Sequence, residues 1–376
     1  RELRMAGPSL YYGMNALSHN VIMADRKKLK SANGLYLGST GSGKSFAAKR
    51  ELLNVFLTIP QDRSIIVDPM GEYAPLVRRL GGQVVEIAPG SPSHINPMDI
   101  QLDLDDDESP LSMKADFLLS LCELVVGGKD GLQPIEKTVI DRCVRLIYRD
   151  MALGLGDGKP PLLQNLYEEL LKQPEPEARD VALAIELFTE GSLNTFAKPT
   201  NVDTNSRILC YDIRDLGRQL LPVGMLVVLD SVFNRIIRNR RLGRSTWVYI
   251  DEIYLLFQHE YSANFLFTLW KRVRKYGACC TGLTQNVDDL LQSHTARTML
   301  ANSEFLVMLN QASTDRAELA RLLNISDNQL SYITNVDFGR GLIKCGSAIV
   351  PFMDHFPKNN LYRLMSTKPS EADAAV

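Results

Sequence analysis

The sequence has few of the residues that build metal centres. Its 376 residues include only five histidines, which are dispersed, and six cysteines. Cys279 and Cys280 are adjacent, the other cysteines are isolated among apolar residues, and none has the spacing of a zinc site. No Cys–His arrangement suggests nucleophilic catalysis. We therefore expect reduced, mostly buried thiols in a cytosolic compartment.

A strong charge bias and a long apolar run are also missing. The 42 Lys and Arg residues nearly balance 44 Asp and Glu residues, so binding of nucleic acid would need a local basic patch. The apolar run over residues 220–229 is interrupted by Pro222 and Gly224 and predicts no membrane span. The chain begins with Arg1 and lacks a signal-peptide pattern, so we expect natural sequence upstream and a cytosolic location.

A glycine-rich segment, G-S-T-G-S-G-K-S, fits the pattern of a phosphate-binding loop. Residues 34–37 before it are apolar, as in a buried strand, and residues 46–53 after it have helical spacing. A strand, a glycine turn and a helix N-terminus together aim backbone N–H groups at one point, where a polyphosphate binds. The predicted nucleotide-binding residues of this segment are Gly38, Ser39, Thr40, Gly41, Ser42, Gly43, Lys44, Ser45 and Phe46.

Within this loop, Lys44 is predicted to reach the β- and γ-phosphates as a catalytic residue, and Ser45 to ligate Mg²⁺. Asp251 and Glu252 end the strand predicted over residues 246–250. We expect Asp251 to bind nucleotide through the shell of the metal and Glu252 to orient or deprotonate the attacking water. The alternative for the acidic residues is a surface pair.

Two further positions could contribute polar groups to the same site. Gln285 ends the strand predicted over residues 278–284, where its amide could sense the γ-phosphate or position water; a polar helix start is the alternative. Asp68 follows the strand predicted over residues 64–67, with Glu72 shortly after it. These two carboxylates either face the ligand crevice or cap the next helix.

Phosphoryl transfer in such sites often uses an arginine from a neighbouring subunit. The candidate catalytic arginines are Arg272 and Arg274, with Arg316 and Arg340 as further candidates, and the sequence does not choose among them.

Two clusters of basic residues are first interpreted as solvated surface charges. Residues 26–30 are expected to be solvated turn charges. A second cluster is expected to be a solvated helix end, with contact to DNA or a partner as the alternative. Its members are Arg235, Arg238, Arg240, Arg241 and Arg244.

Strands and helices alternate along most of the chain, which predicts a three-layer α/β core with a mostly parallel sheet. Residues 111–196 instead have helical periodicity throughout and follow an acidic run, residues 103–108, that we interpret as a solvated linker. The predicted division is residues 1–105 as the first part of the core, 106–200 as an inserted all-α domain, and 201–376 as the second part of the core.

The order and the amino-acid sequences of these segments resemble those of the ATPases of bacterial conjugation and type IV secretion. These are the TraC/TraE-like components encoded fourth in the VirB operon, within the HerA–FtsK group of RecA-like motors. The likeness covers nearly the whole chain, including the position of the insert. It is carried by residues 38–45, Asp68-Pro69, Glu72-Tyr73, residues 95–97, residues 250–252, residues 272–277, residues 281–285 and residues 339–342.

The resemblance implies a RecA-like P-loop NTPase core with an inserted all-α domain, and Mg²⁺-dependent hydrolysis of ATP. It also implies a homo-oligomer, such as a hexameric ring, peripheral at the cytoplasmic face of the inner membrane. There it would contact other secretion components and power pilus assembly and substrate transfer. Family members usually carry another N-terminal domain, so the chain resembles the C-terminal ATPase portion. The alternatives are a DNA-pumping motor, either a coupling protein or a HerA/FtsK-like translocase, and a nucleotide-binding scaffold that barely hydrolyses.

Overall fold

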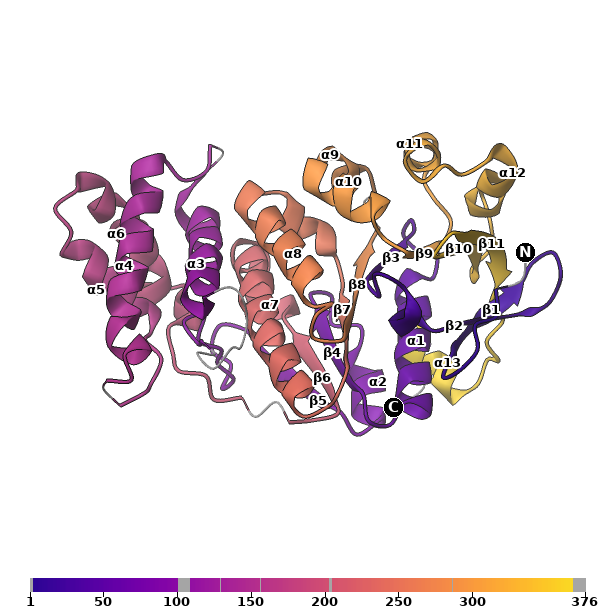
Figure 1. Cartoon of the computed structure of the whole chain (residues 1–376), viewed down its shortest axis with the longest axis horizontal. Helices are drawn as coiled ribbons and strands as arrows, with labels where there is room; N and C mark the ends of the chain where they lie inside the picture. Colours follow the sequence, from indigo (N-terminus) through magenta and orange to yellow (C-terminus); the bar gives the residue numbers. More distant parts are fainter. Residues whose placement is uncertain are drawn as a thin grey trace.

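The computed structural model describes residues 3–100, 109–128, 130–155, 157–202, 205–285 and 287–367. Within these residues, eleven strands form one sheet in the order β2-β1-β11-β10-β9-β3-β8-β7-β4-β6-β5 (Figure 1). The strands are β1 Leu10–Asn15, β2 Val21–Ala24, β3 Gly34–Leu37, β4 Arg63–Asp68, β5 Gln83–Glu86, β6 Ile208–Asp212, β7 Thr246–Ile250, β8 Ala278–Thr284, β9 Phe305–Met308, β10 Arg340–Cys345 and β11 Ala348–Met353.

Seven of these strands form the parallel part of the sheet, from β9 through β3, β8, β7, β4 and β6 to β5. This confirms the α/β class and the mostly parallel sheet. The remaining strands, β10, β11, β1 and β2, extend the sheet in antiparallel fashion. Met14 of β1 pairs with Met353 of β11, so the two ends of the chain complete the same sheet.

Helices cover both faces of the sheet. They are α1 Lys44–Thr58, α2 Ala74–Arg79, α3 Pro110–Val126, α4 Pro134–Ala152, α5 Leu163–Leu171, α6 Pro176–Thr189, α7 Gly217–Arg241, α8 Glu260–Arg272, α9 Val287–Gln292, α10 His294–Ala301, α11 Ser313–Leu323, α12 Asp327–Leu330 and α13 Asn360–Met365. Apolar residues of α1, α2 and α13 pack on one face, and those of α7 to α11 on the other. Successive strand residues enter opposite cores, as a sheet buried on both sides requires.

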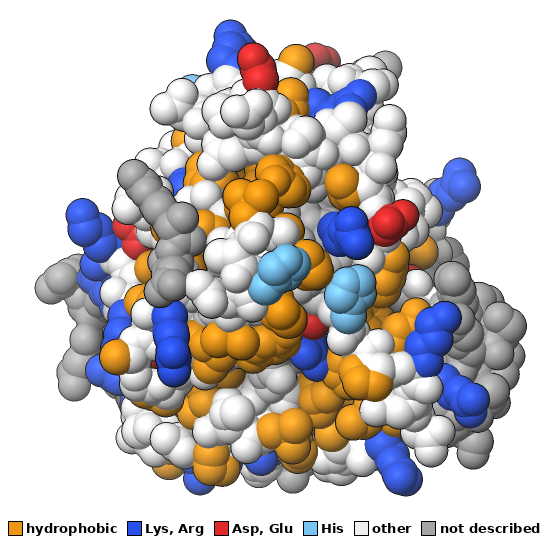
Figure 2. All heavy atoms as spheres, turned by 90° about the vertical axis from the view of Figure 1, so that its right-hand side faces the viewer, with side chains coloured by type: hydrophobic (Ala, Val, Ile, Leu, Met, Phe, Trp, Pro, Cys, Tyr) orange, Lys and Arg blue, Asp and Glu red, His pale blue; other side chains and the backbone are white. Residues whose placement is uncertain are grey.

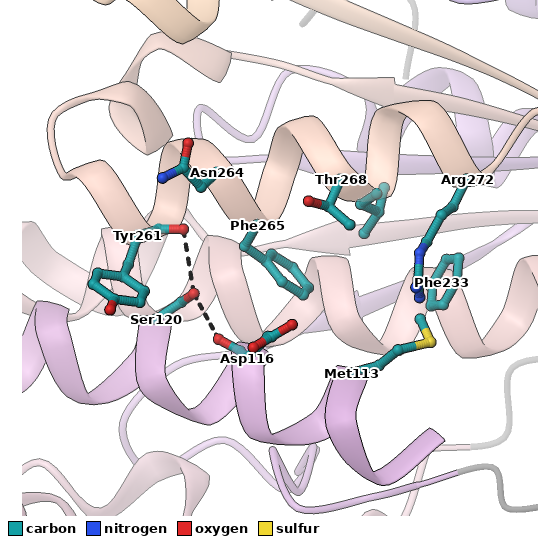
Figure 3. Close-up of a pocket in the computed structure, with 10 residues that line it drawn as sticks. Met113, Asp116, Ser120, Phe233, Tyr261, Asn264, Phe265, Thr268 and Arg272 are labelled. Atoms are coloured by element: carbon teal, nitrogen blue, oxygen red, sulfur yellow. Dashed lines mark hydrogen bonds between the residues drawn. The ribbon is translucent and has the colours of Figure 1, made fainter. Parts of the chain in front are cut away.

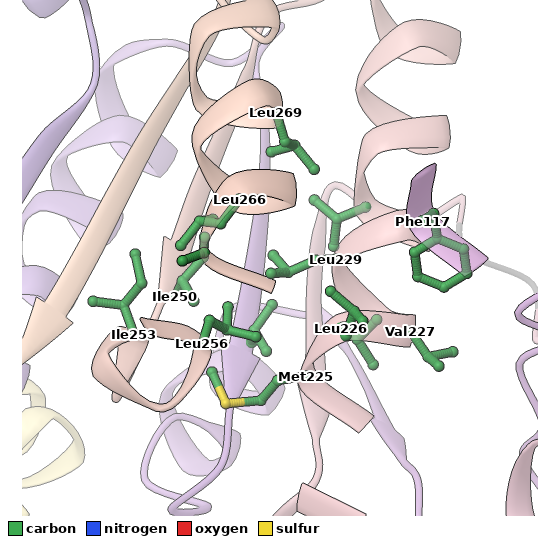
Figure 4. Packing of buried hydrophobic residues seen from close by; sticks show 14 of the residues in the cluster. Phe117, Met225, Leu226, Val227, Leu229, Ile250, Ile253, Leu256, Leu266 and Leu269 are labelled. Carbon is green, nitrogen blue, oxygen red and sulfur yellow. The ribbon is translucent and has the colours of Figure 1, made fainter. Parts of the chain in front are cut away.

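The larger core lies between the sheet and helices α7 and α8. Leu226 and Leu229 of α7 face Leu266 and Leu269 of α8, beside Ile250 at the end of β7 (Figure 4). The same core continues into the helical insert, so the insert and the α/β part share one continuous apolar interior.

Helices α3 to α6 form the helical insert, between β5 and β6 in the chain (Figure 1). A buried ion pair joins it to the core, because Lys114 Nζ of α3 lies 2.6 Å from Asp230 Oδ2 of α7. The predicted acidic linker, residues 103–108, lies outside the described residues, and the domain boundaries stay predictions.

Residues 220–229 are not interrupted at Pro222 and Gly224 as predicted. Pro222 lies inside α7 without ending it, and residues 214–241, a 3-10 turn followed by α7, form a helical stretch that is long and apolar enough to cross a membrane by length and composition alone. In the fold, 78% of its most apolar window is buried, as in a core helix of an α/β protein. The six cysteines are all buried, as predicted.

The antiparallel end of the sheet forms one end of the molecule. Figure 2 shows patches of hydrophobic side chains across this face, with two histidines near its centre. Edge strand β2 contributes Val21, which is 44% exposed, and Leu17 in the β1–β2 turn is 67% exposed.

Candidate active site

The phosphate loop, residues 38–45, runs from β3 into α1 and is held from the side by the segment after β9. The Ser39 N–H donates to the Asn310 carbonyl oxygen at 2.8 Å. Gly41 and Gly43 have φ angles of 76° and 95°, in the left-handed region that glycine tolerates best. A Cβ on Gly43 would also lie 2.6 Å from the Phe338 ring. Both glycines are therefore required by the local backbone.

The loop and the acidic strand end meet in one cleft. Lys44 Nζ lies 3.9 Å from Glu252 Oε1, and both side chains are buried. The Asp251 carboxylate accepts a hydrogen bond from the Glu252 N–H at 2.9 Å. Glu252 has a φ angle of 48°, a strained value for a glutamate and one that concentrates at functional sites. The structure thus brings together Lys44, Asp251 and Glu252, three of the predicted site residues.

The pKa values of Asp251 and Glu252 are both raised in this cleft. Burial raises the pKa of Asp251 to about 7; Lys44 opposes this effect, while Glu252 and Glu72 add to it. Burial also raises the pKa of Glu252, again opposed by Lys44. Oε2 of Glu252 and Oε2 of Glu72 are buried without a hydrogen-bond partner. Two buried carboxylate oxygens of the cleft thus lack a partner, but no group of three or more His, Cys, Asp or Glu within the described residues could hold a metal ion. A metal ion there would need the nucleotide phosphates as further ligands.

Gln285 lies at the tip of the phosphate loop. Thr40 Oγ1 donates to Gln285 Oε1 at 3.0 Å, and the Gly38 N–H approaches the Thr284 carbonyl oxygen at 3.4 Å. The ends of β3, β7 and β8 therefore place the phosphate loop, Asp251, Glu252 and Gln285 along one edge of the sheet, which we call the phosphate edge. The carboxyl ends of parallel strands are where α/β proteins bind ligands.

Comparisons with known proteins agree with this arrangement. The central domain of helicase HerA matches residues 29–189, and the P-loop domain of TraG matches residues 197–340. The structure resembles VirB4 of Thermoanaerobacter pseudethanolicus with a TM-score of 0.83 and 25% identity, covering 95% of this chain and 99% of that chain. This chain is similar to VirB4 and to P-loop ATPases of the HerA–FtsK group.

Solved structures with lower identity and lower TM-scores share the same fold. The plasmid coupling protein TrwB in complex with ADP and Mg²⁺ has a TM-score of 0.57 and 17% identity, covering 94% of this chain and 91% of that chain. TrwB with the non-hydrolysable ATP analogue ADPNP has a TM-score of 0.59, the same identity and the same coverage. These relatives share the RecA-like core with its helical insertion. A comparison with curated proteins gives no match.

In the VirB4-like chain, Asp68 caps the turn into α2. Its carboxylate accepts hydrogen bonds from the N–H groups of Met70, Gly71, Glu72 and Tyr73, at 2.8–3.2 Å. The capping alternative is therefore correct for Asp68. Glu72 instead acts on the cleft, because its charge raises the pKa of both Asp251 and Glu252.

The two leading candidate arginines lie away from the phosphate loop of their own chain. Arg272 lines a cavity of about 240 Å³ between α3, α7 and α8, with Asp116 and Phe233 (Figure 3). Arg274 lines a second cavity, of about 370 Å³, with Trp270. Both precede β8, whose seven residues separate them from Gln285 by on the order of 20 Å. Any contact with a bound nucleotide must therefore come from another protomer.

The two further candidates lie on other elements. Arg316 lies in α11, after β9. Arg340 is exposed at the start of β10. Because Leu342 of β10 pairs with Met308 at the end of β9, Arg340 lies toward the phosphate edge. No contact in the described residues assigns a catalytic role to either.

Sequence reasoning missed a buried polar cluster beneath α1, which we call the Glu51 cluster. Arg26, predicted to be a solvated turn charge, is 0% exposed, and its Nη1 lies 2.7 Å from Glu51 Oε1. The prediction was wrong because partners distant in sequence satisfy this guanidinium: it also donates to Thr281 Oγ1 at 2.8 Å and to the Ala32 carbonyl oxygen. A buried cation is tolerated only with such complete pairing.

Three tyrosine hydroxyls complete the Glu51 cluster. Tyr12 and Tyr36 donate to Glu51 Oε2 at 2.8 Å, and Tyr249 donates to Oε1 at 3.1 Å. Tyr36 precedes the phosphate loop by two residues, Tyr249 precedes Asp251 by two, and Thr281 lies on the strand that ends before Gln285. Glu51 of α1 thereby contacts two of the strands that carry the site, and Arg26 links it to the third, β8.

The second basic cluster is also only partly solvated. Arg235 is buried in α7 and donates to Asn205 Oδ1 at 3.4 Å, whereas Arg238, Arg240 and Arg241 are exposed. The prediction of a solvated helix end is therefore wrong for Arg235, because this residue lies on the buried face of α7.

The raised pKa of Asp251 predicts a pH-dependent stability. The folded-state pKa of about 7 exceeds the ordinary value of 3.8, so this carboxylate destabilises the metal-free fold by an amount that grows as the pH rises from 3.8 to about 7 and is constant above that. That penalty shrinks as the pH falls. We expect Asp251→Asn to be more stable than wild type at pH 8, with the difference decreasing by about 2 kcal/mol toward pH 5.5. Urea unfolding with EDTA present measures it.

The matched control is Asp288→Asn, which changes an exposed aspartate of α9. Its difference from wild type should stay constant over the same pH range. A constant difference for Asp251→Asn as well would contradict the assigned electrostatics.

Proposed function

We propose that this chain is an ATP-hydrolysing motor of a type IV secretion or conjugation system, energising pilus assembly and substrate transfer across the bacterial envelope. The likeness to VirB4 over nearly the full length of both chains supports this function. The single observation that carries the hydrolytic activity is the approach of Lys44 to Glu252, 3.9 Å apart in a buried cleft. A scaffold that only binds nucleotide would not need a strained, unsatisfied carboxylate there.

The mechanism follows from the groups at the phosphate edge. Backbone N–H groups at the α1 end of the loop, residues 43–46, would bind the phosphates, since those of Gly38, Ser39 and Ser42 donate to carbonyl oxygens of the protein. Lys44 would neutralise the β- and γ-oxygens. The Ser45 hydroxyl and the Asp251 carboxylate would hold Mg²⁺, which supplies further positive charge to the phosphate oxygens when it is bound. Glu252 accepts a proton from the attacking water at its free Oε2. Gln285, positioned by Thr40, orients that water.

Assembly and location form part of the same proposal. We propose a homo-oligomer, with a hexameric ring as the expected form, peripheral at the cytoplasmic face of the inner membrane and in contact with other secretion components. Arg272 or Arg274 would act on the site of a neighbouring protomer, because neither can reach its own.

This proposal predicts that turnover depends on neighbours. ATP turnover per protomer should require Mg²⁺ and rise with protein concentration as protomers assemble, whereas a nucleotide-binding scaffold would give a flat, low rate.

Mixing two inactive variants identifies the arginine that acts between protomers. Lys44→Ala and Arg274→Ala should each be inactive alone, yet an equal mixture should recover about a quarter of wild-type turnover. The reason is that about one interface in four of a randomly mixed ring combines an intact site with an intact arginine.

The same mixture is made with Arg272→Ala, Arg316→Ala and Arg340→Ala. Lys44→Ala mixed with Glu252→Gln is the control, since both changes disable the same cleft and no interface can be complete. An arginine variant that is inactive but never recovers in the mixture contradicts action between protomers.

A second candidate function is DNA pumping, favoured by the exposed Arg238, Arg240 and Arg241 at the end of α7. The fold shared with coupling protein TrwB agrees with either function. The turnover assay separates them when double-stranded DNA is added: a stimulation that grows with DNA length and is lost with salt supports the pump.

A further inference from the structure

The strand order indicates how the phosphate chain of a bound nucleotide is oriented relative to the sheet. Lys44 points to Glu252 at the end of β7, so the terminal phosphate lies on the β8 and β7 side of the phosphate loop. On the other side of β3 lie β9 and β10. The nucleoside, at the opposite end of the phosphate chain, therefore extends from the N-terminus of α1 toward β9 and β10.

An aromatic side chain occupies that place. Phe338, just before β10, is 46% exposed although its ring lies against Gly43 of the phosphate loop. Its inner side packs edge-to-face on Phe46, with the ring centroids 5.3 Å apart. Phe46 in turn packs on Phe356 and Tyr362. The ring is therefore supported from within and open to solvent on its outer face.

The segment that carries this ring is attached to the phosphate loop itself. The Val336 N–H donates to Asn310 Oδ1 at 3.3 Å, and the carbonyl oxygen of the same asparagine accepts from the Ser39 N–H. Gly339 has a φ angle of 77°, and a Cβ there would lie 2.5 Å from the Asp354 carbonyl oxygen. Phe338 is thus fixed between a constrained glycine and an asparagine that also holds the loop.

We propose that Phe338 is the platform on which the base of the nucleotide stacks, an inference that rests on the proposed ATP site. The crevice behind the ring, about 30 Å³, is too small for a purine, so the base lies on the outer face. Aromatic stacking uses the π-face that every base has, and it discriminates little between bases. The platform therefore binds adenine and guanine alike and contributes affinity rather than base selectivity.

The test compares nucleotides with a ligand that has no base. Dissociation constants for ATP, GTP and inorganic tripolyphosphate, each with Mg²⁺, are measured by calorimetry. Phe338→Ala and Phe338→Leu should weaken ATP and GTP by about tenfold and leave tripolyphosphate unchanged. Phe338→Tyr, which keeps the ring, should bind all three like wild type. Leu242→Ala, at an exposed leucine at the end of α7, is the matched control.

Three results would overturn the platform. One is an equal loss of ATP and tripolyphosphate in Phe338→Leu, which would make the ring a support for the loop. Another is unchanged ATP binding in both Phe338→Ala and Phe338→Leu, and the third is a tyrosine variant as weak as alanine. Failure of the proposed ATP site has a different signature, because wild type would then bind neither ATP nor tripolyphosphate, or Lys44→Ala would bind both normally.

Discussion

Replacing Glu252 with glutamine should reduce ATP turnover by roughly 10²–10⁴-fold while ATP remains bound. Glutamine keeps the shape of the side chain but cannot take a proton from water. It also removes one of the carboxylates that crowd the cleft around Lys44, so ATP affinity should be equal to or higher than that of wild type. Single-turnover hydrolysis and equilibrium binding, measured on the same preparation, separate the two effects.

Two further variants complete this experiment. Lys44→Ala should lose turnover and ATP affinity together, because in the proposed mechanism the lysine would contact the phosphates in the ground state as well as in the transition state. Glu260→Gln changes an exposed glutamate at the start of α8 and should behave like wild type. Hydrolysis by Glu252→Gln at the wild-type rate would refute the assignment of the general base.

The second large effect concerns stability. Arg26→Met should destabilise the protein by about 3–5 kcal/mol, because it leaves the Glu51 carboxylate buried without its cation. The tyrosine hydroxyls of the Glu51 cluster still donate to the carboxylate but cannot neutralise its charge. Urea unfolding measures the loss.

A double variant distinguishes loss of charge balance from loss of packing. Arg26→Met combined with Glu51→Gln removes both charges but keeps an amide oxygen as acceptor for the tyrosine hydroxyls, so it should recover part of the stability lost in the single variant. Lys30→Met, in the same basic run but exposed, should change the free energy of unfolding little. An Arg26→Met protein within about 1 kcal/mol of wild type would show that the cluster is not a stabilising unit.

Much of this architecture could be predicted from local signals. The strand before Gly38, the helix after Ser45 and the acidic end at Asp251 each follow from residue periodicity and short motifs, and the structure places them at one edge of the sheet. These signals are local because a buried parallel strand reads as an apolar run and a phosphate loop is continuous in sequence.

What could not be predicted depends on partners far apart in the chain. Nothing in residues 26–30 distinguishes the one arginine that faces inward, because its partners are Glu51 and Thr281. Likewise, the pairing of β1 with β11 leaves no trace in the pattern of either strand. Phe338 carries no motif, and only its contact with Gly43 reveals it.

The single glutamate beneath α1 has a mechanical consequence. Its carboxylate accepts hydrogen bonds from Tyr36 below the glycine turn and from Tyr249 below the acidic tip, and Arg26 links it to Thr281 on the strand that ends beside the glutamine. We therefore expect these three strand ends to move together when the phosphate chain shortens. The cleft would then keep its shape during hydrolysis. In the proposed ring, a displacement that follows cleavage would then pass to the adjoining subunit instead of being absorbed within the sheet.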